Sequence, residues 1–314
     1  MPASDSERPA ALVIGDAMVD AYLDARPVGV SDEAPVMTLD WVAVTRSLGG
    51  MLNVARALAE LGFNTTTIGR RGDDETSAWV EEECARFGFD SKWIHTPGPT
   101  IEKTRIVADA DHLARVDREQ VEPLDESFEA ELGRTIDDAV GRADVIVVSD
   151  YDKGFMAPWL VERLMAAGRR HSAPVVVDTK PACMDRYRGA RLLTPNEFEA
   201  RQAAEWLGES TEGDVMRIGE RLVARLEADV LVTRGAGGMT LIRQDGPPIE
   251  APSANTTPAS TSGAGDVVLA VCAAAIAAGD DADAMVRRST RLVGRAMSRP
   301  GTCRITLDDL HAEV

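Results

Sequence analysis

Short runs of apolar, mostly β-branched residues alternate with helical patterns along almost the whole chain, and this alternation constrains the fold more than any other sequence feature. The apolar runs stand at residues 11–15, 65–69, 144–150, 173–179, 190–194 and 228–233. Helical patterns occupy residues 50–61, 73–88, 156–170, 196–206 and 212–227. A strand without polar residues must be covered on both faces, as in a doubly wound sheet. We therefore predict an α/β fold with a mostly parallel sheet flanked by helices.

Two segments, residues 20–47 and 100–119, interrupt this rhythm because polar and apolar residues alternate in them without an intervening helix. Such alternation is typical of antiparallel strands with one face in solvent, so we expect these segments to form a small β lid over the sheet. No linker or internal repeat is visible. We expect residues 11–314 to form a single domain that includes the lid, and residues 1–10 to form a flexible N-terminal tail.

Charge and cysteine content narrow the class of protein. A formal charge of −18 argues against a nucleic-acid partner, because a phosphate backbone would be repelled over most of the surface. The cysteines are far apart in sequence, which argues against a disulfide framework or a zinc site and suits a reducing cytoplasm. We expect no export signal in the polar residues 1–10 and no membrane span, because the longest apolar run, residues 267–278, is too short.

Lysine is scarce in this chain: of 34 basic residues, only Lys92, Lys103, Lys153 and Lys180 are lysines. Where arginine serves as the generic surface cation, a retained lysine can mark a need for a compact point charge, the form suited to phosphate. A general bias in composition is the alternative explanation.

The strongest local motif is the turn from Thr261 to Asp266, which contains Gly263, Ala264 and Gly265 and runs directly into an apolar helical pattern. Unpaired N–H groups at a helix start form a cradle for anions, and small residues let a phosphate approach the backbone. In a purely structural interpretation, Asp266 only stabilises the helix dipole. Beside a bound phosphate, the same carboxylate can accept a proton from an attacking hydroxyl, and we favour that role.

Two further motifs follow strands. Thr233, Gly235 and Gly238 form a glycine-rich turn after residues 228–233, which is either a nucleotide phosphate site or a hairpin turn. Asn196 and Glu199 lie one helical turn apart after residues 190–194. Asn196 can cap the helix, or the pair can organise Mg²⁺ through water. The dinucleotide-binding and P-loop glycine motifs are both absent, so the phosphate machinery must be of another kind.

Taken together, these motifs resemble the ribokinase family of sugar kinases, also called PfkB carbohydrate kinases, over nearly the whole chain. The resemblance rests on the order and spacing of Gly49-Gly50, Asn196-x-x-Glu199, Thr233-x-Gly235-x-x-Gly238 and Gly263-Ala264-Gly265-Asp266. Within the family, the chain is most similar to kinases of D-glycero-β-D-manno-heptose 7-phosphate, which act in ADP-heptose biosynthesis. The segments that carry this similarity include residues 15–22, 30–36, 49–55, 149–154, 175–181, 186–196 and 301–306. No nucleotidyltransferase domain, which bifunctional relatives carry, is expected in these 314 residues.

The resemblance implies a ribokinase-like fold, MgATP as the phosphoryl donor and a role for each matching residue. Asp266 matches the catalytic base, and Gly263, Ala264 and Gly265 match the anion hole. The implied nucleotide-binding residues are Lys180, Asn196, Glu199, Thr233, Gly235 and Gly238, with Asn196 and Glu199 holding Mg²⁺ through water. The implied substrate-binding residues are Asp20, Gly49, Gly50 and Asn53, together with the bases Lys103, Arg105 and Lys153 for the phosphate of a sugar phosphate. For each base, a surface ion pair is the alternative.

The sequence departs from the family pattern at several positions. Ser260 stands where many members carry an aspartate that helps form a monovalent-cation site, which puts activation by potassium in doubt. Ser262 replaces the usual threonine, a mild change, and Val267 replaces a hydroxyl residue that is common after the base. Met51 and Leu52 replace two alanines of the heptose kinases, and the bulkier side chains could reshape the sugar pocket.

These observations predict a cytoplasmic, ATP-dependent sugar kinase, with heptose 7-phosphate as the first choice of acceptor and its 1-hydroxyl as the site of transfer. Ribose, fructose, fructose 1-phosphate and nucleosides are alternative acceptors, and a non-catalytic sugar- or nucleotide-binding homologue is the rival class. Exposed lid strands can pair between subunits, so we also predict a homodimer through the lid.

Overall fold

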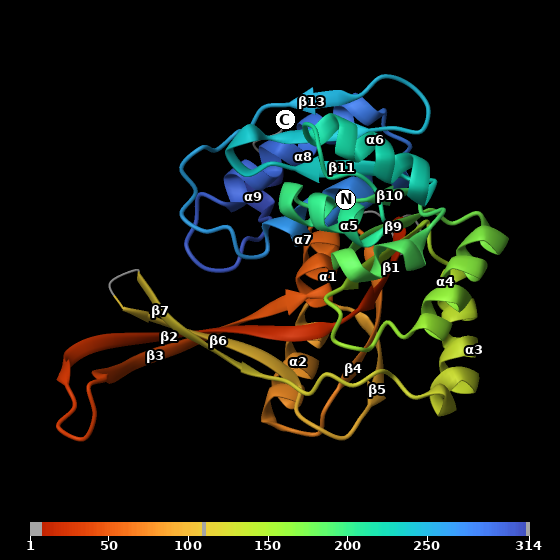
Figure 1. Ribbon diagram of the computed structural model, residues 1–314. Helices are drawn as coiled ribbons and strands as arrows, with labels where there is room; N and C mark the ends of the chain where they lie inside the picture. The colour runs from red at the N-terminus through yellow and green to blue at the C-terminus, as the bar shows by residue number, and fades with distance from the viewer. Residues whose placement is uncertain (1–7, 109–110, 312–314) are drawn as a thin grey trace.

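A computed structural model describes residues 8–108 and 111–311 (Figure 1). Most of the predicted N-terminal tail, residues 1–7, lies outside the described residues. Within the described part of the chain, the strands form a nine-stranded main sheet and a separate four-stranded lid sheet. The order of the main sheet is β13-β12-β11-β10-β9-β8-β1-β4-β5. The strands are β1 (Ala10–Gly15), β4 (Asn64–Arg71), β5 (Asp90–His95), β8 (Val145–Asp150), β9 (Val175–Thr179), β10 (Leu192–Leu193), β11 (Asp229–Thr233), β12 (Met239–Ile242) and β13 (Ile249–Ala251).

The main sheet is parallel except at one edge, where β12 pairs antiparallel with both β11 and β13. Alternate residues of its apolar strands pack on opposite faces, and each face has its own hydrophobic core. One face is covered by α1 (Met51–Glu60), α2 (Glu75–Arg86), α7 (Ala264–Ala278) and α8 (Ala282–Ala296). The other face is covered by α3 (Glu129–Val140), α4 (Pro158–His171), α5 (Glu197–Trp206) and α6 (Val215–Leu226). Helices therefore flank the sheet on both sides, which confirms the predicted doubly wound fold.

The lid sheet consists of β2 (Ala17–Val30), β3 (Met37–Gly50), β6 (Ile101–Ala108) and β7 (Asp111–Arg118), and it projects sideways from the body (Figure 1). Its order is β3-β2-β6-β7. The pairs β2–β3 and β6–β7 are antiparallel, as predicted, but the central pair β2–β6 is parallel. The predicted antiparallel lid is therefore confirmed within each hairpin, and the parallel pair arises where two hairpins far apart in sequence meet side by side.

Parallel strands bring their carboxyl ends to one edge of a sheet, where ligands of open α/β folds commonly bind. The strands β1, β8, β9 and β11 end at this edge, at Gly15, Asp150, Thr179 and Thr233. The short helix α9 (Leu307–His311) lies near the end of the chain. In residues 8–108 and 111–311, we find no helix that combines the length and the hydrophobicity needed to cross a bilayer.

Candidate active site

The predicted anion cradle forms the start of α7. Gly263 takes the N-cap position with φ 76°, a left-handed conformation that favours glycine. The Ala264 N–H donates to the carbonyl of Thr261 at 3.2 Å. Among the described residues, neither the Gly265 N–H nor the Asp266 N–H has a hydrogen-bond acceptor in the protein. The turn thus presents two unpaired amides at the positive end of a 15-residue helix, as an anion site requires.

Asp266 lies directly behind these amides and is buried, with 2% of its surface exposed. Asn53 Nδ2 donates to Asp266 Oδ2 at 2.9 Å, and the Tyr151 hydroxyl donates to Asp266 Oδ1, also at 2.9 Å. Burial raises the pKa of Asp266 to about 7, although both hydrogen bonds act in the opposite direction. A carboxyl group with a pKa in this range can exchange a proton near neutral pH.

A buried arginine supports this arrangement from α1. Arg56 donates to Asn53 Oδ1 at 2.6 Å, which leaves the amide nitrogen of Asn53 pointing at Asp266. Burial lowers the pKa of Arg56 to about 10, so the guanidinium remains charged at neutral pH. The charged hydrogen bond from Arg56 therefore fixes the orientation of the Asn53 amide.

The residues predicted to bind nucleotide line one cavity of about 400 Å³, which we call the nucleotide cavity after that prediction. Its walls include Lys180, Asn196, Glu199, Thr233, Gly235 and Gly238 together with Ala264 and Gly265 of the cradle. Apolar residues also line it: Val268 of α7, Val293 of α8 and Met297, which directly follows α8. A volume of this size with a few convergent polar groups is typical of a small-molecule site.

Asn196 and Glu199 form a reciprocal capping box at the start of α5, so the structural interpretation of this pair is correct. Glu199 Oε1 also accepts from Lys180 Nζ at 2.8 Å. Carboxylate and amide oxygens keep further lone pairs in such a network, so the capping role is compatible with contact to metal-bound water. No group of three or more acidic, histidine or cysteine residues that could hold a metal directly occurs in the described residues.

The glycine-rich turn after β11 is a hairpin to β12, which was one of the two predicted alternatives. Thr233, Gly235 and Gly238 of this turn also line the cavity of about 400 Å³, and the other alternative, a nucleotide phosphate site, stays a prediction. Gly238 has φ 84°, and a Cβ there would lie 2.0 Å from the carbonyl oxygen of Ala251. Only glycine fits this position without a backbone shift.

On the lid side of Asp266, the residues predicted to bind sugar lie close together. Arg105 donates to Asp20 Oδ1 at 2.6 Å, and a Cβ on Gly49 would lie 2.6 Å from Asp20 Oδ2. Gly50 has φ 55° at the junction of β3 and α1, three residues before Asn53, which donates to Asp266. The glycines therefore keep a narrow space beside Asp20 free of side chains.

The predicted phosphate-binding bases also lie on this side, and each has an acidic neighbour. Lys153 Nζ contacts Glu119 Oε1 at 2.6 Å, and Lys103 Nζ lies 3.9 Å from Asp117 Oδ2. Burial and the charge of Lys153 lower the pKa of Lys103. The two ammonium groups are thus close enough to repel each other, and both sit in a partly dehydrated site.

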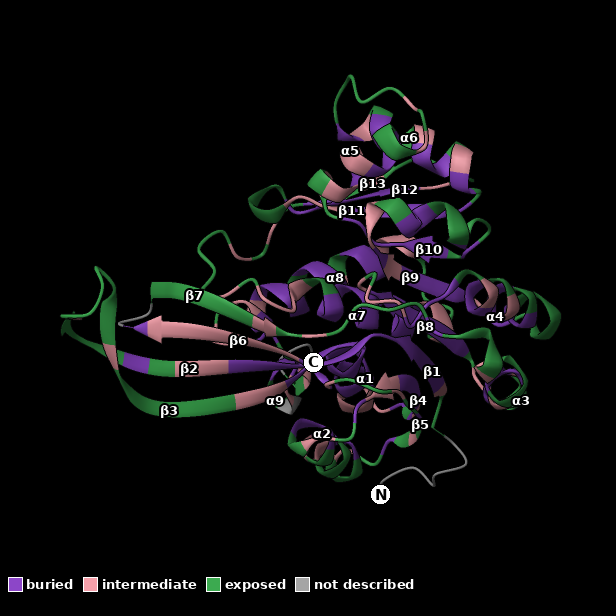
Figure 2. Ribbon diagram, turned by 60° about the horizontal axis from the view of Figure 1, so that its bottom comes forward, coloured by how far each residue is buried: buried purple, intermediate pink, exposed green. Residues whose placement is uncertain are grey.

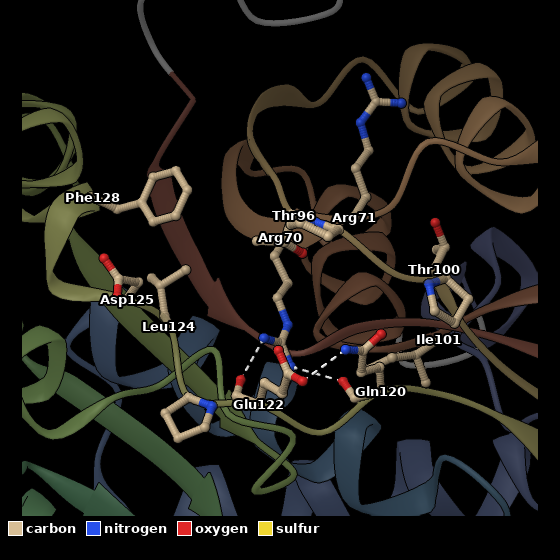
Figure 3. Close-up of a pocket in the computed structure, with 13 residues that line it drawn as sticks. Arg70, Arg71, Thr96, Thr100, Ile101, Gln120, Glu122, Leu124, Asp125 and Phe128 are labelled. Atoms are coloured by element: carbon tan, nitrogen blue, oxygen red, sulfur yellow. Dashed lines mark hydrogen bonds between the residues drawn. The ribbon is translucent and has the colours of Figure 1, made fainter.

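A second, smaller cavity of about 120 Å³ lies where β4 meets the segment that follows β7 (Figure 3). Arg70 reaches across it and donates to the carbonyl oxygens of Gln120 and Glu122, and also to that of Lys153. Because these donors bond to backbone, Arg70 fixes the loop that carries Lys153. We interpret this cavity as structural support for the lid side of the site.

Sequence reasoning missed three residues of the site: Tyr151, Asp178 and Thr302. Tyr151 and Asp178 line the nucleotide cavity, and a Cβ on Gly265 would lie 3.4 Å from Asp178 Oδ2. Burial and the charge of Glu199 raise the pKa of Asp178 to about 8, so this carboxyl can be neutral at pH 7. Thr302 accepts a hydrogen bond from Ser47 Oγ at 3.1 Å and faces Asp20.

Three residues that depart from the family pattern, Met51, Leu52 and Ser260, contact the protein's own core or backbone. Met51 and Leu52, the first two residues of α1, have fully buried side chains in the core, and a Cβ on Gly69 would lie 2.6 Å from Met51 Cε. They pack into the body and not into open space. Ser260 Oγ accepts from the Ser262 N–H at 3.3 Å, so this hydroxyl supports the turn before the cradle.

Comparison with known proteins places the chain in a family. Residues 9–309 match the pfkB family of carbohydrate kinases. The bifunctional protein HldE of Azorhizobium caulinodans is 35% identical over 303 residues, which cover 96% of this chain and 63% of that protein. The HldE protein of Geotalea uraniireducens is 36% identical over 312 residues, which cover 97% of this chain and 62% of that protein. The chain therefore spans less than two thirds of the length of these relatives.

Two solved structures have the same fold. Phosphofructokinase-2 from Escherichia coli, in complex with substrates and products, has a TM-score of 0.80 at 20% identity over 97% of each chain. Ribokinase from Thermotoga maritima has a TM-score of 0.74 at 19% identity, covering 97% of this chain and 98% of the other. The ribokinase-like fold is thus confirmed. With a family match over nearly its whole length, this chain belongs to the pfkB family of carbohydrate kinases.

Proposed function

We propose that this protein is an ATP-dependent kinase that phosphorylates the 1-hydroxyl of heptose 7-phosphate. One observation carries the proposal: Asp266 stands between the nucleotide cavity, through Tyr151, and the lid side with its acidic and basic residues, through Asn53. A sugar hydroxyl and a terminal phosphate can meet only where both spaces adjoin, and a buried proton acceptor is already there.

In the proposed reaction, the sugar hydroxyl oxygen attacks the γ-phosphorus in line with the bond to the β-phosphate. The new oxygen–phosphorus bond forms as that bond breaks, ADP leaves, and the hydroxyl proton passes to Asp266. The unpaired N–H groups of Gly265 and Asp266 stabilise charge on the transferring group. Closure of the lid over the sugar would exclude water and so limit hydrolysis of ATP.

The amide oxygen of Asn196 and the carboxylate of Glu199 line the cavity and are oxygen ligands of the kind that suits Mg²⁺. Asn196 and Glu199 would hold it through water, and it would supply neutralising charge. Lys180 lies on the same wall and would contact the phosphates directly. No role for a monovalent cation is proposed, because Ser260 supplies a hydroxyl where an aspartate is common.

The choice of a phosphorylated acceptor rests on the lid. Lys103, Arg105 and Lys153 converge there, and lysine is rare elsewhere in the chain. Each ammonium has three donors, so Lys153 can contact Glu119 and a phosphate together. The resemblance of residues 149–154 and 301–306 to the heptose phosphate kinases, and the matched HldE relatives, favour a heptose over other sugars.

The protein is further proposed to form a homodimer through the lid. The parts of β2 and β3 that run beyond the body are largely exposed (Figure 2). Several of the exposed residues there have large apolar side chains. They include Val28, Val30, Met37, Trp41, Val42 and Val44. A thin sheet with this much exposed apolar surface is normally covered, and a second copy of the same lid can do so symmetrically.

The test is release of ADP, measured with a coupled assay, from ATP and a panel of acceptors. The panel contains heptose 7-phosphate, fructose 1-phosphate, ribose, fructose and nucleosides. We expect the highest kcat/KM with heptose 7-phosphate. A clear preference for another acceptor would contradict the proposed substrate but support the proposed kinase activity. No ADP release with any acceptor would favour a non-catalytic binding protein.

A further inference from the structure

Tyr151 contacts Asp266, the proposed proton acceptor, and also lines the nucleotide cavity. Its hydroxyl donates to Asp266 Oδ1 at 2.9 Å, and its ring lies 5.2 Å from Lys180 Nζ. Its N–H donates to Asp16 Oδ2 at 2.8 Å, which fixes the backbone after β8. The residue is therefore held at both ends, and its side chain forms part of the cavity wall.

We propose that Tyr151 is a positioning residue for phosphoryl transfer, whose hydroxyl keeps Asp266 oriented and ionised for accepting the proton of the sugar hydroxyl. This inference rests on the proposed kinase function. With Asn53 on Oδ2 and Tyr151 on Oδ1, each carboxylate oxygen has one donor and retains a lone pair. The carboxylate cannot rotate without breaking one of these bonds, so the remaining lone pairs have fixed directions.

The hydrogen bond from Tyr151 also favours the charged form of Asp266. Burial raises the pKa of Asp266, and the donors oppose that shift. Burial and the neighbouring charge of Asp266 keep the pKa of Tyr151 well above its usual value, so the phenol remains a neutral donor across the physiological range. Removing this donor therefore raises the pKa of Asp266, and catalysis should need a higher pH.

Other charged or titratable groups face Asp266 from every side and are unchanged by a substitution at Tyr151. They are Arg56 on α1, Asp20 on β2, Asp178 on β9, Lys180 after β9 and Cys303 near the end of the chain. A shift in the pH profile on removal of one hydroxyl can thus be assigned to that hydroxyl.

The experiment compares the pH dependence of kcat/KM for the wild-type chain, Tyr151→Phe and the matched control Tyr22→Phe. The Tyr22 hydroxyl approaches Thr302 at 3.5 Å and has no contact with Asp266 among those of the described residues. We expect the acid limb of Tyr151→Phe to move up by about 1 pH unit. Activity at pH 7 then falls about fivefold and recovers at high pH, whereas the limb of Tyr22→Phe stays in place. An equal loss at every pH would overturn the inference.

A second measurement does not depend on activity. We expect Tyr151→Phe to lower the Tm more in the wild-type background than in the Asp266→Asn background, because the phenol then has a weaker acceptor to lose. Equal losses in both backgrounds would overturn the inference even if no sugar were phosphorylated. An inactive wild-type chain with unequal losses would reject the proposed kinase function and leave the Tyr151–Asp266 coupling intact.

Discussion

Asn53 Nδ2 donates to Asp266 Oδ2 over 2.9 Å, although 213 positions separate the two residues in the chain. The contact joins the first turn of α1, which follows the lid, to the first turn of α7, which follows the anion cradle. It therefore couples the side where the sugar is proposed to bind to the group proposed to accept its proton. The same amide donates to the carbonyl of Cys303 at 3.2 Å, so the carboxyl-terminal loop closes around this point.

Asp266→Asn is the most direct test of the site. An amide cannot accept the proton, so we expect kcat to fall by about 10²- to 10⁴-fold, with little change in nucleotide affinity. Nucleotide affinity can be measured by calorimetry and kcat by ADP release. Asp280→Asn is the control and should retain full activity, because Asp280 is exposed and lies just beyond the carboxyl end of α7. Near-normal turnover of Asp266→Asn would show that Asp266 is not the group that accepts the proton.

The pH profile of the wild-type enzyme gives an independent check. The carboxylate must be ionised to accept a proton, and burial raises its pKa to about 7. Activity should therefore rise with pH and reach half its maximum near pH 7 in kcat/KM, which reports on the free enzyme. A profile that is flat down to pH 5 would show that the essential group is a different one.

Gly263→Ala tests the geometry of the cradle. A Cβ there would lie 2.7 Å from Asn53 Nδ2 and 2.8 Å from Thr302 Cγ2, in a backbone conformation with φ 76°. We expect at least about a tenfold loss of kcat, because Asn53 must move away from Asp266. Gly279→Ala is the matched control at the other end of α7, with φ 73° and no atom within 4 Å of the added carbon.

The two glycine variants should differ in activity more than in stability. Both carry the cost of a left-handed alanine, about 1 kcal/mol, which thermal unfolding can measure. If Gly279→Ala lost as much kcat as Gly263→Ala, the effect would reflect weakening of α7 in general and not displacement of Asn53.

The main sheet could be predicted from the sequence because its central strands are buried on both faces and appear as continuous apolar runs. The edge strand β5 was missed for the converse reason: of its residues Asp90–His95, only Ile94 is buried. The parallel β2–β6 pair also could not be predicted, since the two strands are far apart in sequence and no local pattern specifies their register. Pairing of this kind is decided by tertiary packing.

The candidate site shows a similar division. Asp266 and its glycines could be found from the sequence, because an anion cradle is a local motif. Tyr151 and Asp178 were missed, although each lies at or directly after the end of a predicted strand. The rule that ligands bind at the carboxyl edge of a parallel sheet could have identified both. The contact of Thr302 with the lid had no such signal, because a loop near the end of the chain can fold over any part of the body.

Lys103→Met tests the proposed binding of a sugar phosphate. Loss of a charged contact should raise KM for the phosphorylated acceptor by about 10- to 100-fold and leave KM for ATP nearly unchanged. Arg115 still pairs with Asp117 through two hydrogen bonds, so the variant does not leave that carboxylate uncompensated. Lys92→Met is the matched control, because Lys92 is exposed on β5 and pairs with Asp90. A rise in KM for ATP alone would place Lys103 on the nucleotide side instead.

Trp41→Ser tests the proposed dimer. Trp41 is 68% exposed on β3, where the lid runs beyond the body. If a second lid covers it, truncation should weaken the dimer by about 2 kcal/mol, or roughly thirtyfold in the dissociation constant. Trp206→Ser is the matched control, since Trp206 is 70% exposed on α5. Sedimentation over a range of concentrations should show dissociation of Trp41→Ser at concentrations where the wild-type chain and Trp206→Ser remain dimeric. A wild-type chain that is monomeric throughout would contradict the dimer, and an unchanged Trp41→Ser dimer would place the interface on another surface.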